Sequence, residues 1–145
     1  MATFQEQQRR HLARYREDCA EVGLAAAREK LVTAYQASQH LVIGPHTDGV
    51  PLAVGFARMR PMTEKLGVRE EFVDVSPGDG TDAALAVQVT CSCREAGCTD
   101  EPVICEAYLE ATRRAFPEVS AEAVLQQVKG AHVCVFRYAR PVGDE

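Results

Sequence analysis

The first part of the chain alternates apolar and polar positions with the spacing of an amphipathic helix. Between Leu24 and Tyr35 apolar side chains recur at helical spacing, while Arg28 and Lys30 lie on the opposite side. This period predicts a helix over residues 3–40, interrupted near Gly23. The segment before Gly23 has sparser apolar positions on a surface dense in Gln and Arg. We expect these N-terminal helices to pack on a second copy of the chain in a homodimer.

The middle of the chain predicts short elements separated by turns. Residues 40–44 are largely apolar and predict a short strand, and the Gly, Pro and Asp content of residues 44–51 predicts a loop. In this loop His46 and Asp48 either face a ligand or lie in a solvated turn. The elements that follow are expected to be a helix over 61–66 opened by Pro61, a strand over 71–75 and a turn over 76–81.

Residues 83–93 carry the clearest strand pattern. Apolar and polar side chains alternate there. One face collects Leu85, Val87, Val89, Cys91 and Cys93. Two thiols therefore continue an apolar face of the predicted strand.

A helix is predicted next, over residues 101–116. Thr99 or Asp100 suits its N-cap, and Pro117 ends it. Cys105 falls on the apolar stripe of this helix, so we expect its side chain to point inward.

The end of the chain predicts a β-hairpin. Its strands would cover 122–129 and 132–139, joined by a type II′ turn at Gly130 and Ala131. This pairing places Gln127 opposite Cys134 and Leu125 opposite Phe136. Because both faces are apolar, we expect the hairpin to be covered on both sides. The predicted fold class is α+β, a single domain with N-terminal helices packed on a mostly antiparallel sheet that ends in this hairpin.

Composition narrows the range of functions. The chain has 145 residues, with 16 basic and 21 acidic side chains and a formal charge of −5, which argues against nucleic acid or an anionic membrane as partner. No apolar run approaches the ~18 residues of a membrane-spanning helix, and the polar start lacks the apolar segment of a signal peptide. We therefore expect a cytoplasmic protein. In that reducing compartment its six cysteines are expected to be free or metal-bound.

The cysteine spacing supports a metal site as one reading. Cys91, Cys93 and Cys98 can supply three of the four ligands of a tetrahedral Zn²⁺ ion, and Cys105, Cys134 or His132 the fourth. The usual Cys-x2-Cys pair of structural zinc sites is missing from the sequence. Zinc is therefore the expected cofactor if the cysteines bind a metal. If they act in catalysis instead, no cofactor is expected.

Thiol catalysis is the other reading of the same residues. His132 is the natural base for Cys134, because two positions along a strand place side chains on one face, roughly 6–7 Å apart at Cα. Cys105 lies in the first turns of the predicted helix, where the helix dipole lowers a thiol pKa. Against both readings, a free cysteine is often only a small buried hydrophobe, as expected for Cys19. Arg137 and Arg140 are expected to be surface charges.

From Val89 onward the chain resembles the L-2-amino-thiazoline-4-carboxylic acid hydrolase-like family, and more distantly the 4-vinyl reductase domains. The residues that carry this resemblance are Cys91, then Ile104-Cys105-Glu106-Ala-Tyr108, and finally Gly130, His132, Cys134, Phe136 and Arg137. The pair Cys93 and Cys98 departs from the pattern of either group.

The resemblance implies an α+β domain that holds a small ligand, with Cys105 and Cys134 as candidates for the chemistry. It implies hydrolytic opening of a cyclic amidine. Our prediction is thus an enzyme that uses cysteine chemistry on a small heterocyclic or thiol-containing substrate, with Cys105 or Cys134 as nucleophile and His132 as acid or base. The alternative is a non-catalytic small-molecule sensor or zinc-thiolate domain.

Overall fold

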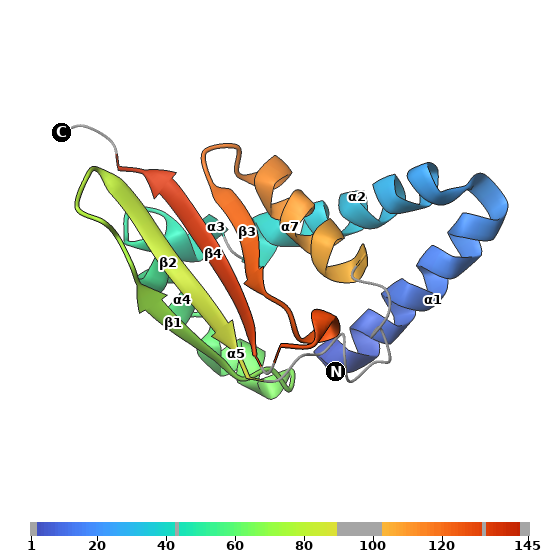
Figure 1. Ribbon diagram of the computed structural model, residues 1–145, viewed down its shortest axis with the longest axis horizontal. Helices are drawn as coiled ribbons and strands as arrows, with labels where there is room; N and C mark the ends of the chain where they lie inside the picture. The colour runs from blue at the N-terminus through green and yellow to red at the C-terminus, as the bar shows by residue number, and fades with distance from the viewer. Residues whose placement is uncertain (1–2, 43, 90–102, 132, 143–145) are drawn as a thin grey trace.

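Two long helices open the fold and form a projecting hairpin (Figure 1). The computed structural model describes residues 3–42, 44–89, 103–131 and 133–142. Helix α1 (Phe4–Val22) begins at a capping box between Thr3 and Glu6, and α2 (Leu24–Val42) follows directly after Gly23. Gly23 has a φ of 86°, a left-handed value that glycine adopts without strain, and it ends α1 there. The predicted interruption near Gly23 is confirmed.

Helices replace the strand and the first part of the loop that were predicted after residue 40. Helix α2 continues to Val42, so the prediction of a strand over 40–44 is wrong. The next helices are α3 (Gly44–Thr47), α4 (Leu52–Ala57) and α5 (Arg60–Lys65). A short apolar run fits either structure. Here the preceding helix extends to Val42, because each added residue gains one hydrogen bond at little cost. The predicted helix opened by Pro61 is confirmed.

A four-stranded antiparallel sheet forms the second layer, in the order β1-β2-β4-β3. Its strands are β1 (Glu70–Asp74), β2 (Thr81–Gln88), β3 (Ser120–Leu125) and β4 (Cys134–Pro141). Helix α7 (Val103–Ala115) precedes β3, as the pattern predicted, and Cys105 points inward. The predicted α+β class with an antiparallel sheet is therefore confirmed.

The C-terminal hairpin has a different register from the predicted one. Ala123 pairs with Phe136, and Leu125 pairs with Val135 across an irregularity in β3. The predicted type II′ turn is replaced by a 3-10 turn (Gln127–Lys129), which ends at Gly130 with a φ of 99°. This turn shortens β3 at its end, because its residues bond back to the Gln126 carbonyl instead of continuing the ladder. The predicted pairs of Gln127 with Cys134 and Leu125 with Phe136 are wrong.

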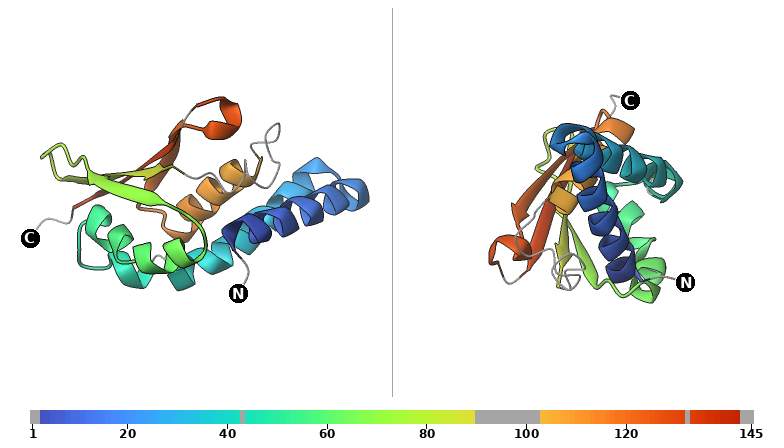
Figure 2. Two further views of the ribbon diagram at one scale, coloured as in Figure 1. Left: turned by 90° about the horizontal axis from the view of Figure 1, so that it is seen from below. Right: turned by 90° about the vertical axis from the view of Figure 1, so that its right-hand side faces the viewer.

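Helices cover one face of the sheet, which we call the inner face (Figure 2). It carries Phe72, Ala84, Ala86, Phe136 and Tyr138, which pack on α4 and α7. Phe56 of α4 contacts Phe72 and Tyr138, with ring centroids 5.6 and 5.1 Å apart. Helices α1 and α2 pack behind α7, so the main core lies between the sheet and these helices.

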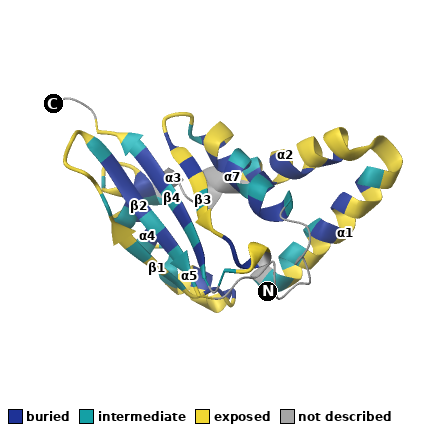
Figure 3. Ribbon diagram, viewed as in Figure 1, coloured by how far each residue is buried: buried dark blue, intermediate teal, exposed yellow. Residues whose placement is uncertain are grey.

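The opposite face, which we call the outer face, is not covered by any of the described helices (Figure 2). Its larger apolar members are Val73, Leu85, Val87, Leu125 and Val135, and the small residues Ala83 and Ala139 on the same face are buried. Figure 3 shows the resulting alternation of buried and less buried residues along β4. The expected cover on both sides is therefore wrong for the described chain. In the described part of the predicted 83–93 strand, Leu85 and Val87 lie on the outer face, and the small residues Ala84 and Ala86 face the core; Cys91 and Cys93 lie outside the described residues.

A buried ion pair fixes the α3–α4 connection to the sheet. Arg140 Nε lies 3.1 Å from Asp82 Oδ2, and its guanidinium also donates to the carbonyls of Thr47 and Val50. Both Asp82 oxygens accept the Leu52 N–H, at 3.0 and 3.2 Å. The Arg140 side chain is only 19% exposed. The expectation that Arg140 is a surface charge is therefore wrong, because the pairing with Asp82 stabilises its burial.

Candidate functional site

Cys134 lies at the start of β4 and is almost completely buried, with 1% of its surface exposed. The backbone N–H of Gln127 donates to its Sγ atom at 3.3 Å. A hydrogen bond to sulfur stabilises the thiolate relative to the thiol. The fold therefore gives this cysteine one of the features that a nucleophilic thiol requires.

The inner face becomes polar at the end of the sheet where Cys134 lies. Glu70 pairs with Gln88, and Gln88 pairs with Cys134, so the three side chains form a row across β1, β2 and β4. We call Glu70, Gln88 and Cys134 the polar row. Neighbouring residues in such a row have Cβ atoms roughly 5 Å apart. A carboxyl group, an amide and a thiol are thus brought together at one end of the core.

The carboxyl group of the polar row is electrostatically perturbed. Burial raises the pKa of Glu70, and the hydrogen bond from Gln88 Nε2, 3.0 Å from Glu70 Oε2, and the charge of Arg60 only partly offset this. A carboxyl group whose pKa is raised can exchange protons closer to neutral pH. Glu70 is therefore a candidate proton donor or acceptor in the same row as the thiol, with Gln88 between them.

Two glutamines border the polar row after β3. Gln127 Nε2 donates to the Val89 carbonyl at 2.9 Å and so links the 3-10 turn to the end of β2. Gln126 has an extended backbone and follows Leu125, which is exposed on the outer face, so its side chain points to the inner side. Its Nε2 atom is buried and has no hydrogen-bond partner among the described residues. This amide leaves a donor available on the same side of the sheet as Cys134.

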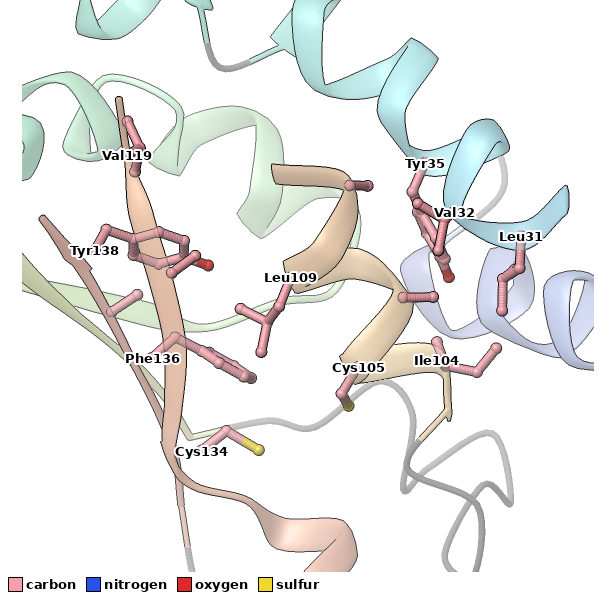
Figure 4. Close-up of a cluster of buried hydrophobic side chains, with 14 of the residues drawn as sticks. Leu31, Val32, Tyr35, Ile104, Cys105, Leu109, Val119, Cys134, Phe136 and Tyr138 are labelled. Carbon is pink, nitrogen blue, oxygen red and sulfur yellow. The ribbon is translucent and has the colours of Figure 1, made fainter. Parts of the chain in front are cut away.

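Cys105 faces the same region from the first turns of α7. Figure 4 shows Cys134 pointing from β4 toward α7, the helix that carries Cys105. Cys105 is 8% exposed and belongs to the same core cluster as Cys134. Burial raises the pKa of Tyr138 well above its usual value, and the charges of Tyr108, Glu70 and Cys105 add to this increase, partly offset by Arg113. These ionisable groups are therefore close enough to influence one another.

Four of the predicted site residues fall in parts of the chain that the structure does not describe. They are Cys91, Cys93, Cys98 and His132. Within the described ranges, no group of three or more His, Cys, Asp or Glu side chains is arranged to hold a metal ion. The zinc reading and the role of His132 thus stay predictions, and the structure brings together only Cys105 and Cys134 of the predicted set.

Sequence analysis missed Glu70 and did not connect Gln88 with the thiols. Both lie in strands, and only the cross-strand register places Gln88 beside Cys134 and Glu70 next to Gln88. The alternation in β2 did place Gln88 on the face opposite Leu85 and Val87. A polar residue on the core-facing side near the end of a strand was the one feature of the sequence that could have pointed to this site. The loop residues His46 and Asp48 are partly buried and exposed, respectively, and lie next to the α3–α4 connection.

The chain matches no known protein-family model and no curated protein. None of the helices in the described ranges is both long and apolar enough to cross a membrane. A proposal about function therefore depends on the geometry of the site around Cys134.

Proposed function

We propose that this protein is a cytoplasmic enzyme that uses cysteine chemistry to hydrolyse a carbon–nitrogen bond in a small cyclic amidine or a related thiol-containing heterocycle. The observation that supports it best is the polar row, in which a thiol that accepts a backbone N–H and a carboxyl group of raised pKa lie on either side of the Gln88 amide. Thiol catalysis needs a stabilised thiolate and a group that moves protons. The resemblance of the C-terminal part to the thiazoline hydrolase-like family suggests the substrate class.

Cys134 is the better candidate for the nucleophile. The Gln127 N–H donates to its sulfur, whereas the support for Cys105 is its place near the start of α7, where the helix dipole favours a thiolate. Glu70 and His132 are the candidates for proton transfer. The unpaired amide of Gln126 would donate to a polar atom of the substrate.

The proposed reaction adds one molecule of water to the ring. The Cys134 sulfur bonds to the amidine carbon, and the ring nitrogen takes up protons as its bond to that carbon breaks. Water then attacks the same carbon, and the sulfur leaves as the thiol takes back a proton. Over the cycle the carbon gains the oxygen of water, the nitrogen gains its two hydrogens, and the thiol is regenerated.

Turnover of L-2-amino-thiazoline-4-carboxylate is the direct test. Purified protein should convert it to a product heavier by one water, followed by chromatography and mass spectrometry. Cys134→Ser should abolish turnover, and Glu70→Gln should slow it on the order of a hundredfold, as expected for loss of a general acid or base. Cys19→Ser is the matched control, because Cys19 lies on α1 and is only partly buried.

Metal analysis of the same protein distinguishes the alternative. If the protein turns over no cyclic amidine, contains one equivalent of zinc and shows no fast-reacting thiol, the enzyme proposal is wrong. The cysteines would then act as ligands in a sensing or structural domain. Turnover that persists in Cys134→Ser and stops in Cys105→Ser would instead move the nucleophile to α7.

A further inference from the structure

A hollow of about 300 Å³ lies between α1 and α2, outside the thiol site. Its walls include His11, Arg14, Tyr15, Asp18, Lys30 and Leu31. Figure 2 shows these two helices running side by side away from the sheet. The volume is at the lower end of the range for small-molecule sites, about 300–1,000 Å³.

Asp18 is the unusual residue of this hollow. Its side chain is only 5% exposed, and its buried Oδ1 atom has no hydrogen-bond partner in the described chain. A buried carboxylate oxygen without a donor lowers the stability of the folded protein. Asp18 Oδ1 can therefore accept a hydrogen bond from a ligand.

Arg14 and Lys30 lie near Asp18 but too far away to form short hydrogen bonds with it. Arg14 Nε lies 3.5 Å and Lys30 Nζ 3.7 Å from Oδ1, longer than the roughly 2.7–2.9 Å of a charge-assisted hydrogen bond. Their side chains are 70% and 52% exposed, so water screens both charges. Both cations lie at the rim of the hollow, where an anion from solvent can reach them.

The inner wall of the hollow is apolar. Tyr15 and Leu31 are buried members of the core cluster. Burial lowers the pKa of His11, so its ring is neutral near pH 7, and its centroid lies 4.6 Å from that of Tyr35. The hollow thus combines one buried anion, an apolar wall and two cations at the rim.

We infer that this hollow binds a small molecule of the α-amino acid class, with an ammonium group, a carboxylate and an apolar side chain. The ammonium group donates to Asp18, which supplies the missing hydrogen bond. Arg14 and Lys30 then bind the carboxylate, and the apolar side chain contacts Tyr15 and Leu31. This ligand offers a group of opposite charge to Asp18 and to both rim cations, whereas a simple amine offers the two cations no carboxylate. The inference goes beyond the proposed function and does not depend on it.

A titration of ¹⁵N-labelled full-length protein with L-leucine tests this site. Two matched probes separate the contacts: leucinamide lacks the carboxylate, and 4-methylpentanoate lacks the amine. We expect leucine to shift amide signals of α1 and α2, and both matched probes to bind about tenfold more weakly or worse. No shift with leucine, or equal binding of all three probes, overturns the inference.

Variants assign the contacts to residues. Asp18→Asn should weaken leucine binding by about tenfold or more. Arg14→Gln and Lys30→Gln change exposed side chains, so they keep the test valid if Asp18→Asn fails to fold. Both should weaken leucine binding and leave leucinamide binding unchanged. Glu17→Gln, exposed on the same helix, is the control. Unchanged leucine affinity in Arg14→Gln and Lys30→Gln contradicts the inference.

Discussion

Arg140 and Asp82 pair directly across β4 and β2, and their side chains meet at 3.1 Å in a largely buried position. The same carboxylate holds the Leu52 N–H at the start of α4, so one ion pair joins the sheet to the α3–α4 connection. Removing one partner of a buried pair leaves the other charge uncompensated.

Asp82→Asn should therefore lower the free energy of unfolding by about 3–5 kcal/mol, measured by urea denaturation. The control is Glu122→Gln, which removes an exposed carboxylate 4.0 Å from Arg137 and should cost less than about 1 kcal/mol. Equal effects of the two substitutions would show that Arg140 is well solvated in the native protein.

Glu70 should make stability depend on pH in the acidic range. Its pKa is raised in the folded state, so the native protein holds this proton more tightly than the unfolded chain does. The stabilisation is complete below the unfolded pKa near 4.5 and is lost as pH rises through the folded pKa. Glu70→Gln should therefore be more stable than wild type at pH 7, and this difference should shrink as the pH falls toward 4.5 and stay constant below it.

Chemical denaturation at a series of pH values measures this difference. Glu71→Gln is the matched control, because Glu71 is the next residue of β1 and its side chain is 71% exposed. Its difference from wild type should stay constant across the same range. A constant difference for Glu70→Gln as well would contradict the burial of this carboxyl group.

Gly55 should resist substitution because of a close approach between α4 and α3. A Cβ atom at this position would lie 2.6 Å from the His46 carbonyl oxygen and 2.7 Å from Thr47 Cα. Both are backbone atoms, so the two helices would have to separate. Gly55→Ala should therefore lower stability by about 1–3 kcal/mol despite the better helix propensity of alanine.

Thermal unfolding checks this prediction. Val54→Ala serves as the control, since Val54 is the preceding residue of α4 and is 47% exposed. Its melting temperature should stay close to that of wild type. An increase in the melting temperature of Gly55→Ala would mean that helix propensity outweighs the contact.

Tyr138 should limit stability in alkaline solution. Burial raises its pKa well above the ordinary value of 10.0, so the unfolded chain loses this proton first. The stabilisation is complete below pH 10 and declines as pH rises above it. Tyr138→Phe should therefore lose less stability than wild type between pH 9 and pH 11. Parallel stability curves for the two proteins over this range would refute the prediction.

The helices could be predicted from the sequence because their signals are local. The apolar spacing from Leu24 to Tyr35 and the glycine at position 23 are each signals that involve only nearby residues. The structure contains both the helix and the interruption that they predict. The hairpin register could not be predicted. It depends on an irregularity between Ala123 and Leu125 and on a 3-10 turn, which alternation alone does not reveal.

The site was only partly predictable for a similar reason. Cys105 and Cys134 carry a recognisable chemistry, and both reach the core as expected. Glu70 does not differ in type from the other acidic residues around it. Its raised pKa comes from burial in the folded protein, which depends on long-range contacts that no local pattern encodes.

The uncovered outer face has a consequence for association between copies of the chain. Both edges of the sheet oppose the addition of further strands: β1 carries Glu70, Glu71 and Asp74 within five residues, and β3 is interrupted by its bulge. Growth by edge pairing into open-ended fibrils is therefore disfavoured even though Val73 and Leu125 are exposed. Contacts made by these residues would instead pack the outer faces of two sheets against each other. Such packing stops at a pair, because each chain has one outer face.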